Sequence, residues 1–334
     1  MHYAYPPRKD SHPPPFRPRG PSRFSRLPTI RRSQFKSIGL IGLVIFALIW
    51  LFSGSGSGSR SYGPSKMTSS SSQQHQTKIS HTISGTPPVV IVTVFDDKYD
   101  GTEYGSQIKE NRGQYAKKHG YSTFMAKVSD YDLKGAPSSW AKVVAMRHAI
   151  STFPDAKYIW YLDQHAVVMN PNTKIEDHVM SASKLDAVML KDHSVVPPDS
   201  IIKTDTKLKG AKVDCVVTQD KDGITTSSIV VKNGEWAKFF LDTWWNPLYR
   251  SYNFQKAERH ALEHIVQWHP TILSNLAIIP QHIINAYSTS ESGAQYNDGD
   301  LAVVFNQCHE TGATSCSSQA ARFTKEWQEK LGSD

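Results

Sequence analysis

The sequence predicts an α/β domain with a mostly parallel sheet, preceded by a single transmembrane helix. Three observations lead to this prediction. Runs of β-branched residues alternate with helix-like segments after residue 88, as in sheets that helices cover on both faces. Several of the apolar runs end on a carboxylate. An uncharged apolar segment follows a basic stretch near the N-terminus, as in a membrane anchor.

The positive charge of the chain is concentrated at its start. Residues 1–36 hold nine basic side chains and one acidic, which accounts for the whole net charge of +8. The rest of the chain has no net charge and therefore lacks the electrostatic surface of a nucleic-acid-binding protein. We expect a basic, Pro-rich cytoplasmic tail and no nucleic-acid partner.

The apolar segment spans residues 37–52. Its 16 residues fall just below the roughly 17–25 of a typical transmembrane helix, so a cleaved signal peptide and a buried core helix are alternatives. The long basic prelude and the Ser-Gly sequence after residue 52 favour a signal anchor. The positive-inside rule then predicts a type II protein with a lumenal C-terminus. Residues 53–87 are rich in Ser, Gly, Gln and Thr and predict a flexible stem.

Residues 88–334 are the predicted lumenal domain, and its first half alternates strands with helices. Strands are expected at 89–95, 121–126 and 157–162, and helices at 103–119 and 140–153. Gly120 and Pro154 directly follow the helix patterns and predict where these helices end. Because crossovers between parallel strands are right-handed, this order predicts a parallel sheet.

The second half of the domain has weaker patterns. Short strands are expected at 184–191, 213–218 and 223–231, helices at 235–245 and 258–268, and a return to the sheet within 273–284. Aromatic side chains recur at spacings of three and four in the first of these helices, which predicts that it packs on the core.

Acidic residues follow the predicted parallel strands. Asp96 and Asp97 follow the first strand, and Asp163 follows the third. The carboxyl ends of parallel strands meet at one edge, where α/β sheets bind ligands, so these carboxylates should converge. His165 should lie on the same side as Asp163 if the backbone stays extended, and both side chain types bind divalent metals. The alternatives are a hydrogen-bonding Asp163 and a packing or hydrogen-bonding His165.

Several short motifs occur in one order between residues 89 and 308. They are Ser139-Trp140-Ala141-Lys142, Trp160-Tyr161-Leu162-Asp163, Met169-Asn170-Pro171, Gly234-Glu235-Trp236, Ala261-Leu262-Glu263-His264 and Ile279-Pro280-Gln281. This ordered set resembles glycosyltransferase family 34, and most of all its fungal branch of Golgi α-1,6-mannosyltransferases. The resemblance implies a GT-A fold, GDP-mannose as donor, Mn²⁺ as cofactor and retention of the α configuration. It also implies work on the N-glycan mannan backbone within a complex of mannosyltransferase subunits in the Golgi membrane.

The resemblance also implies roles for individual residues. Asp163 is expected to bind the metal and to be essential for catalysis, with His165 in the place of the second carboxylate of an Asp-x-Asp motif. Glu258 is expected to position the acceptor or to stabilise the oxocarbenium face.

Further residues are candidates for binding the two substrates. Lys142, Asp96 and Ser227 are the candidates for the donor. Asp220 and Asp222 lie in a Gln-Asp-Lys-Asp-Gly loop, where they would contact acceptor hydroxyls or simply form a solvated turn.

Some positions depart from the pattern of the family. Val304 stands where many members have a His that completes the metal shell, and Arg259 replaces a polar neutral residue. These departures favour an alternative in which the chain is a weak or inactive subunit that keeps the fold and stabilises an active partner. An anchored lectin-like binder is a third reading. Among the three cysteines, Cys308 and Cys316 can close a short disulfide loop, which would leave Cys215 free.

Overall fold

The computed structural model describes residues 80–82, 85–197 and 200–331. The predicted cytoplasmic tail, the predicted transmembrane segment 37–52 and most of the predicted stem lie outside these residues. Within the described part of the chain, no helix has the length and apolar character needed to cross a membrane.

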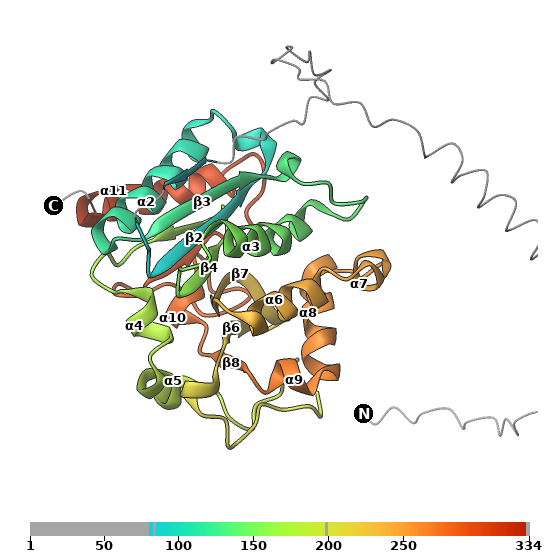
Figure 1. Cartoon of the computed structure of the whole chain (residues 1–334). Helices are drawn as coiled ribbons and strands as arrows, with labels where there is room; N and C mark the ends of the chain where they lie inside the picture. The colour runs from blue at the N-terminus through green and yellow to red at the C-terminus, as the bar shows by residue number, and fades with distance from the viewer. Residues whose placement is uncertain (1–79, 83–84, 198–199, 332–334) are drawn as a thin grey trace, which may run out of the picture. The chain divides into compact units, whose positions relative to one another are not determined.

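A seven-stranded sheet runs through the domain in the order β1-β3-β2-β4-β7-β6-β8 (Figure 1). Its strands are β1 (Ser80–Thr82), β2 (Val89–Phe95), β3 (Ser122–Lys127), β4 (Tyr158–Leu162), β6 (Cys215–Asp220), β7 (Gly223–Lys232) and β8 (Leu276–Ile279). β2 is parallel to β3 and β4, and β6 is parallel to β8. β7 is antiparallel to both β4 and β6, and β1 is antiparallel to β3.

The sheet is therefore mixed, and the prediction of a mostly parallel sheet is wrong. The reason is the connection between β6 and β7, in which Asp220 pairs with Gly223 and only two residues form the turn. A parallel pair needs a crossover of a dozen or more residues, so this connection can only make a hairpin. Gly223 has a φ of +133°, which favours glycine at the start of β7.

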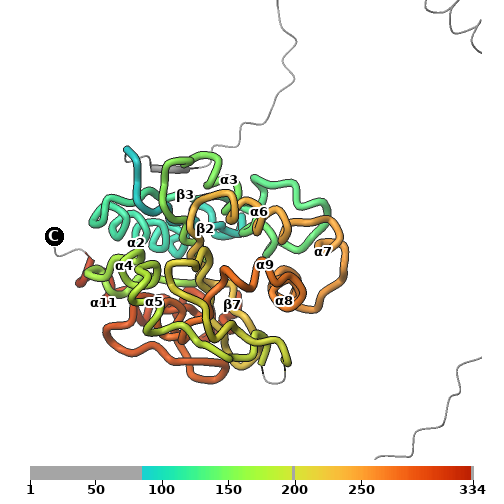
Figure 2. The backbone as a smooth tube through the Cα atoms, turned by 60° about the horizontal axis from the view of Figure 1, so that its bottom comes forward, coloured from blue at the N-terminus to red at the C-terminus, as the bar shows by residue number. Residues whose placement is uncertain are grey.

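Helices cover both faces of the sheet (Figures 1 and 2). On one face lie α2 (Glu103–His119) and α11 (Cys316–Leu331), and on the other lie α3 (Ala141–Thr152), α6 (Glu235–Trp244) and α8 (Ala257–Trp268). Alternate residues of β2 pack into the two cores, with Val89 and Ile91 in one and Val90 and Val92 in the other. This explains the continuous apolar run of β2, because both of its faces are buried.

A second, three-stranded sheet lies beside the first. It has the order β5-β10-β9, with β5 (Ala166–Val168), β10 (Ala302–Val304) and β9 (Ala286–Tyr287). β10 is antiparallel to β5 and parallel to β9. The residues between β4 and β5 are Asp163, Gln164 and His165, so this tripeptide carries the chain from one sheet to the other.

The remaining helices are short. They are α4 (Ile175–Val179), α5 (Ala182–Val188), α7 (Pro247–Ser251), α9 (Pro270–Leu273) and α10 (His282–Asn285). The strand predicted at 184–191 is wrong, because α5 occupies most of that range. Leu185 is the buried side chain of α5, whereas Ser183 and Ala187, two residues to either side, are exposed. A strand would place all three side chains on one face, so this burial pattern fits a helix.

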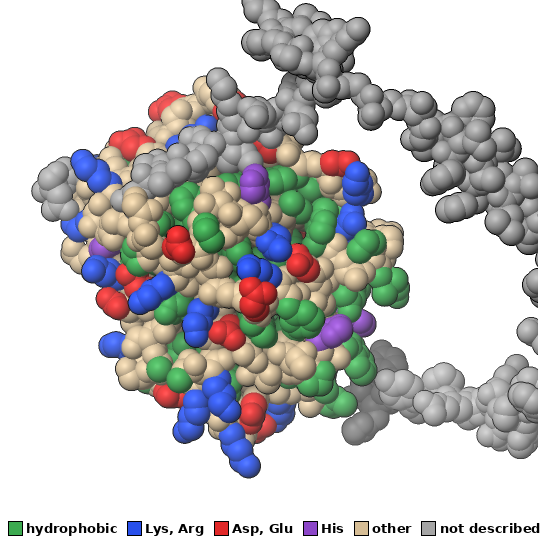
Figure 3. All heavy atoms as spheres, in the orientation of Figure 1, with side chains coloured by type: hydrophobic (Ala, Val, Ile, Leu, Met, Phe, Trp, Pro, Cys, Tyr) green, Lys and Arg blue, Asp and Glu red, His purple; other side chains and the backbone are tan. Residues whose placement is uncertain are grey.

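Other predictions for the domain are confirmed. α2 spans the predicted residues 103–119, and Gly120 ends it with a φ of +68°. Cys308 and Cys316 form a disulfide, and Cys215 is free and buried. Acidic and basic side chains are interspersed over the face of the domain in Figure 3.

Candidate active site

The link between the two sheets orients the Asp163 side chain. The backbone N–H of Asp163 donates to the carbonyl of Ser227 at 2.8 Å, and the N–H of Ala166 donates back to the carbonyl of Asp163 at 3.1 Å. The carboxylate accepts the N–H of His165 at 2.9 Å and the hydroxyl of Tyr161 at 3.1 Å. Asp163 is therefore held at the end of β4 by its own turn, with one hydrogen bond to each carboxylate oxygen.

Two cavities meet at this turn, and we name each after its basic residue. The Lys142 cavity has a volume of about 160 Å³, and its lining includes Asp96, Ser138, Ser139 and Lys142. The Arg259 cavity has a volume of about 260 Å³, and its lining includes Asp220, Asp222, Ser227, Arg259, Tyr287 and Val304. Asp163 and His165 line both cavities. The structure thus brings these two predicted residues together on a shared wall.

Lys142 forms a buried ion pair with Glu258. Its ammonium lies 2.8 Å from the Glu258 carboxylate and donates to the hydroxyl of Thr226 at 3.0 Å. The exposed fractions of the two charged side chains are only 8% and 6%. Burial raises the pKa of Glu258, but the charge and hydrogen bond of Lys142 outweigh it and hold that pKa below its usual value. Glu258 is not among the residues that line the two cavities, and it contacts Lys142 and Thr226, so its role towards the substrate stays a prediction.

Asp96 and Asp97 have different surroundings. Asp96 is bound by the Gln164 side chain, which accepts the Asp96 N–H at 2.8 Å and donates to the Asp96 carboxylate at 2.9 Å. Asp97 is exposed and accepts hydrogen bonds from Ser129 instead. The predicted convergence of three carboxylates is therefore wrong for Asp97, because the chain turns outward after Asp96.

The remaining predicted substrate contacts lie on the Arg259 cavity. Ser227, predicted to bind the donor, lines this cavity rather than the Lys142 cavity. Both oxygens of the Asp220 carboxylate are occupied, one by Arg259 at 2.5 Å and the other by the Tyr287 hydroxyl at 2.8 Å. Asp222 is exposed and lies 3.4 Å from the Lys256 ammonium.

His165 is packed between aromatic rings and the disulfide. Its Nδ1 lies 2.8 Å from the hydroxyl of Tyr104, and that hydroxyl donates to the carbonyl of Gln164 at 2.9 Å. A carbonyl only accepts, so the single Tyr104 proton goes to Gln164 and the Nδ1–H of His165 donates to Tyr104. Burial lowers the pKa of His165, so the ring is neutral at neutral pH and Nε2 carries the lone pair.

The His165 ring also lies close to the sulfurs of Cys308 and Cys316, with the ligand atoms of the three residues within 4.8 Å of one another. The sulfurs form a disulfide, so they are not available as thiolate ligands. The metal-binding atoms that remain at this turn are the Asp163 oxygens and the His165 nitrogen.

Burial raises the pKa of Asp163, but the His165 ring, Lys142 and the hydrogen bonds from His165 and Tyr161 outweigh it, so that this pKa lies below its usual value. The carboxylate is ionised at neutral pH. An ionised carboxylate beside a neutral imidazole offers one oxygen and one nitrogen donor to a cation.

Two residues that hold the turn in place were not predicted from the sequence. Gln164 connects the ends of β2 and β4, as described above. Arg112 of α2 is fully buried and donates to the carbonyls of Asp163 and Ala166. A signal for Arg112 was present, since it lies four residues after Ile108 and three before Tyr115 on the apolar face of α2.

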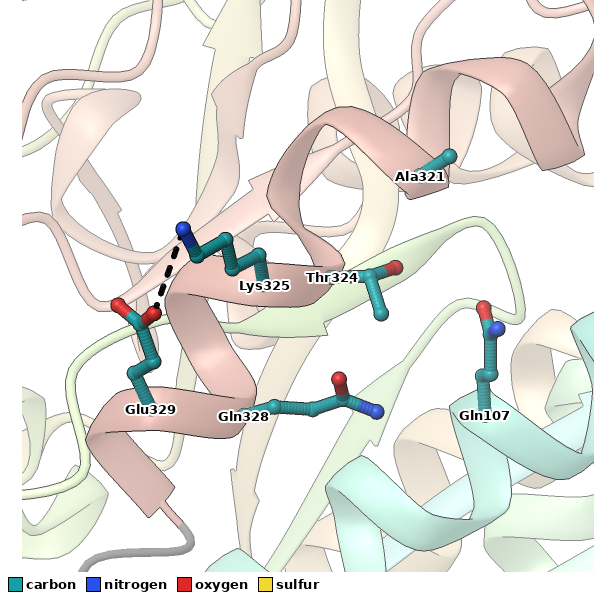
Figure 4. Close-up of a pocket in the computed structure, with 6 residues that line it drawn as sticks. All are labelled: Gln107, Ala321, Thr324, Lys325, Gln328 and Glu329. Atoms are coloured by element: carbon teal, nitrogen blue, oxygen red, sulfur yellow. Dashed lines mark ion pairs between the residues drawn. The ribbon is translucent and has the colours of Figure 1, made fainter.

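A larger hollow lies elsewhere, between α2 and α11 (Figure 4). Its volume is about 540 Å³, and its lining includes Gln107, Lys325 and Glu329. The side chains of Lys325 and Glu329 are mostly exposed and lie 3.8 Å apart. The hollow shares no lining residue with the two cavities at Asp163. Without a buried ionised group in its lining, it is the weaker candidate for catalysis.

The mixed α/β fold, the polar cavities and the similarity to known proteins define the class of this protein as a glycosyltransferase. The chain belongs to the galactosyl transferase GMA12/MNN10 family, that is, glycosyltransferase family 34, whose family model matches residues 85–315. The resemblance to family 34 is therefore confirmed.

Relatives of two kinds are similar to this chain. An uncharacterized alpha-1,2-galactosyltransferase of Schizosaccharomyces pombe is 34% identical over 67% of this chain and 71% of its own length. The probable alpha-1,6-mannosyltransferase MNN11 of Saccharomyces cerevisiae is 32% identical over 70% of this chain and 60% of its own length. The probable alpha-1,6-mannosyltransferase MNN10 of the same yeast is 27% identical over 64% and 58%. The match thus spans about 60% of the length of the two mannosyltransferases.

Among solved structures, a glycosyltransferase involved in the glycosylation of the major capsid of PBCV-1 is similar to this chain, with a TM-score of 0.49 and 13% identity. The similarity covers 72% of this chain and all of that one.

Proposed function

We propose that this protein is a retaining α-1,6-mannosyltransferase that transfers mannose from GDP-mannose to the α-1,6-linked mannan backbone of N-glycans. The observation that carries the proposal is that Asp163 and His165 form a wall shared by two polar cavities. A transferase must hold a donor and an acceptor on either side of the bond that changes. The choice of mannose is supported by the similarity to MNN11 and MNN10.

The Lys142 cavity suits the diphosphate end of the donor. It contains the ammonium of Lys142 and the hydroxyl of Ser138, which are donors for phosphate oxygens, whereas the hydroxyl of Ser139 donates to Glu258. Glu258 and Thr226 take up two of the three ammonium N–H groups, which leaves one for a ligand. Glu258 would therefore orient Lys142 rather than react itself.

The Arg259 cavity suits a sugar acceptor, because its wall offers hydroxyl, carboxylate and amide groups that hydrogen-bond to sugar hydroxyls. Each cavity alone is smaller than the roughly 300–1,000 Å³ of ligand pockets, whereas the two joined at Asp163 reach that range. One active site spanning both cavities therefore fits better than two separate sites.

A divalent cation such as Mn²⁺ fits the charges at this wall. Among the ion pairs of the described residues, none involves Asp96 or Asp163, so a cation could balance their charges. Asp163 and Nε2 of His165 would hold the ion, whereas Val304 on the same wall offers no donor atom. When bound, the ion would neutralise charge on the departing diphosphate.

The proposal extends to the setting of the enzyme: a Golgi membrane, with one transmembrane helix at residues 37–52 and other mannosyltransferase subunits as partners. Protease protection of membrane vesicles carrying the full chain, tagged at either end, tests the topology. We expect digestion of the N-terminal tag and protection of the C-terminal tag. The opposite pattern would contradict the type II topology.

A specific observation favours a second candidate, a galactosyltransferase. Relatives named as alpha-1,2-galactosyltransferases are 34%, 30% and 29% identical to this chain, a range that includes the 32% of MNN11. The departures at His165, Val304 and Arg259 favour a further alternative, a subunit with little activity that stabilises an active partner.

A donor comparison with the purified full chain separates these candidates. GDP-mannose and UDP-galactose are each supplied with an α-mannoside acceptor, with and without Mn²⁺, and the product linkage is determined. We expect α-1,6-mannosyl transfer that depends on Mn²⁺. Transfer from UDP-galactose alone would replace the proposal with the second candidate, and transfer from neither donor would favour the stabilising subunit.

A further inference from the structure

One face of α2 binds the turn that carries Asp163. Tyr104, Asn111 and Arg112 lie on this face together with the apolar Ile108 and Tyr115, at the spacing of buried helix positions. All five side chains are buried. Polar groups in such positions need partners, and here the partners come from the backbone that follows β4.

Arg112, Tyr104 and Asn111 together donate hydrogen bonds to four backbone carbonyl groups between residues 163 and 168. Nη2 of Arg112 donates to the carbonyls of Asp163 at 3.0 Å and Ala166 at 2.8 Å. The Tyr104 hydroxyl donates to the carbonyl of Gln164 at 2.9 Å. The Asn111 amide donates to the carbonyl of Val168 at 2.9 Å and accepts the Val168 N–H at 2.8 Å.

Arg112 is the central member of this set. Its Nη2 bridges the first and last carbonyls of the Asp163–Ala166 turn, and its Nη1 donates to the side chain of Asn111 at 2.7 Å. Among the ion pairs of the described residues none involves Arg112, and its Nε has no partner there. Burying a guanidinium without a carboxylate partner lowers the stability of the fold. Packing alone therefore does not explain why an arginine is buried at position 112.

We infer that Arg112, assisted by Tyr104 and Asn111, positions the Asp163–Ala166 turn so that Asp163 and His165 face both cavities. The planar guanidinium suits this purpose, because it reaches two carbonyls in fixed directions, whereas the ammonium of a lysine is a point charge on a flexible stem. Arg112 is thus a positioning residue that acts through the backbone of Asp163. The inference rests on the proposed function only for the part of the test that measures activity.

The test uses Arg112→Lys in the full chain, with Arg147→Lys as the matched control. Arg147 is a partly exposed arginine of α3 that pairs with Asp242 at 3.0 Å. Hydrogen exchange is measured at the amides of His165, Ala166 and Val168, and at amides of β2 as an internal reference. We expect about tenfold faster exchange in the turn of Arg112→Lys, with β2 unchanged, and no change in Arg147→Lys.

Two further readouts separate positioning from a general structural effect. Mn²⁺ affinity, measured by calorimetry with the metal alone, should fall about tenfold in Arg112→Lys. In transfer assays kcat should fall more than the KM for the acceptor rises. Equal acceleration of exchange throughout the sheet, or unchanged exchange and affinity in the turn, would overturn the inference.

Tyr104→Phe provides a second variant if Arg112→Lys does not fold. It removes only the hydroxyl that binds the carbonyl of Gln164 and Nδ1 of His165, and the ring keeps its packing. We expect a smaller acceleration of exchange, confined to the turn. If the wild-type chain proves to have no transferase activity, the proposed function fails, while the exchange result still decides whether α2 positions the turn.

Discussion

Lys142 and Arg259 are the basic residues of the two cavities that meet at Asp163, and their charges are balanced in different ways. Among the described residues, Lys142 has a single acidic partner, Glu258, and both side chains are nearly fully buried, with the uncharged Thr226 as a shared hydrogen-bond partner. Arg259 lies between two acids, with Asp220 at 2.5 Å and Glu263 at 3.7 Å, and is 18% exposed. The charge of Lys142 is therefore balanced by one acid, whereas the charge of Arg259 is balanced by two, so that either acid alone could still pair with it.

This difference shows how the fold balances a partly buried arginine. Arg259 adds a positive charge to the wall, and Asp220, Glu263 and Tyr287 surround it. Both oxygens of the Asp220 carboxylate accept hydrogen bonds in this arrangement, one from Arg259 and one from Tyr287. Acceptor binding in the proposed enzyme would thus depend on Asp222 and on the hydroxyl and amide groups of the wall.

The largest effect is expected for the Lys142–Glu258 pair, because each has only one partner of opposite charge in the described part of the chain. Lys142→Met leaves the buried Glu258 without its cation and should lower the free energy of unfolding by about 3–5 kcal/mol. Lys142→Met combined with Glu258→Leu should lose less, because no uncompensated charge remains. Urea unfolding of both variants measures this. If the single variant is as stable as the wild type, the ion pair does not hold the Lys142 cavity together.

A smaller effect is expected for the disulfide beside His165. Replacing Cys308 and Cys316 by serine opens a loop with a sequence separation of 8, which should cost about 2–3 kcal/mol. Thermal unfolding of the double variant, compared with Cys215→Ser as a control, measures the loss. An unchanged Tm in the double variant would show that this disulfide contributes nothing to the wall that both cavities share.

Arg259→Gln should have a milder effect than Lys142→Met. It leaves Asp220 with the Tyr287 hydroxyl as a partner, so we expect a loss of about 1–3 kcal/mol in the free energy of unfolding. In the proposed enzyme the KM for the acceptor should rise more than the KM for the donor, because Arg259 lines only the second cavity. Steady-state kinetics, with Arg147→Gln as the control, check this. A rise confined to the donor KM would reverse the assignment of the cavities.

The smallest effect concerns pH, and here the two cavities should respond in opposite directions. Burial raises the pKa of Glu258, but Lys142 holds it below its usual value, so the stabilising contribution of the pair is lost as the pH falls through that lowered pKa. Burial raises the pKa of Glu263 by more than the charge of Arg259 lowers it, so the folded state favours the protonated carboxyl group. The free energy of unfolding therefore falls as the pH rises through this raised pKa.

Unfolding free energies of Glu258→Gln and Glu263→Gln, measured by urea between about pH 3 and pH 7, test this contrast. The wild type should become more stable as the pH rises and Glu258 ionises, and Glu258→Gln should lack this increase. Glu263→Gln should gain stability over the wild type as the pH rises. Parallel pH profiles for the two variants would show that the cavities do not differ in this respect.

Local sequence patterns predicted most of the fold, and the errors have physical causes. α2 and β2 follow from apolar periodicity, a β-branched run and the glycine at position 120, which are local signals. The antiparallel β7 was missed because strand direction depends on the two-residue turn before Gly223 rather than on strand composition. The helix α5 was missed because its apolar residues also fit a short strand.

The position of Asp163 was predictable because it directly follows a buried strand. Asp163 lies at the end of β4, as expected for a ligand-binding residue in a sheet of this kind. The pairing of Lys142 with Glu258 and the support from Arg112 could not be predicted, because both join residues that are far apart in the sequence. Such contacts depend on how the helices pack, which periodicity alone does not determine.

Calorimetric titration of the full chain with GDP-mannose in the presence of Mn²⁺ tests directly whether donor binding depends on Asp163. Asp163→Asn is compared with Asp97→Asn, since Asp97 follows the same edge of the sheet but is exposed and contacts Ser129. We expect binding by the wild type and by Asp97→Asn, and no measurable binding by Asp163→Asn. Binding by Asp163→Asn with the affinity of the wild type would contradict this expectation.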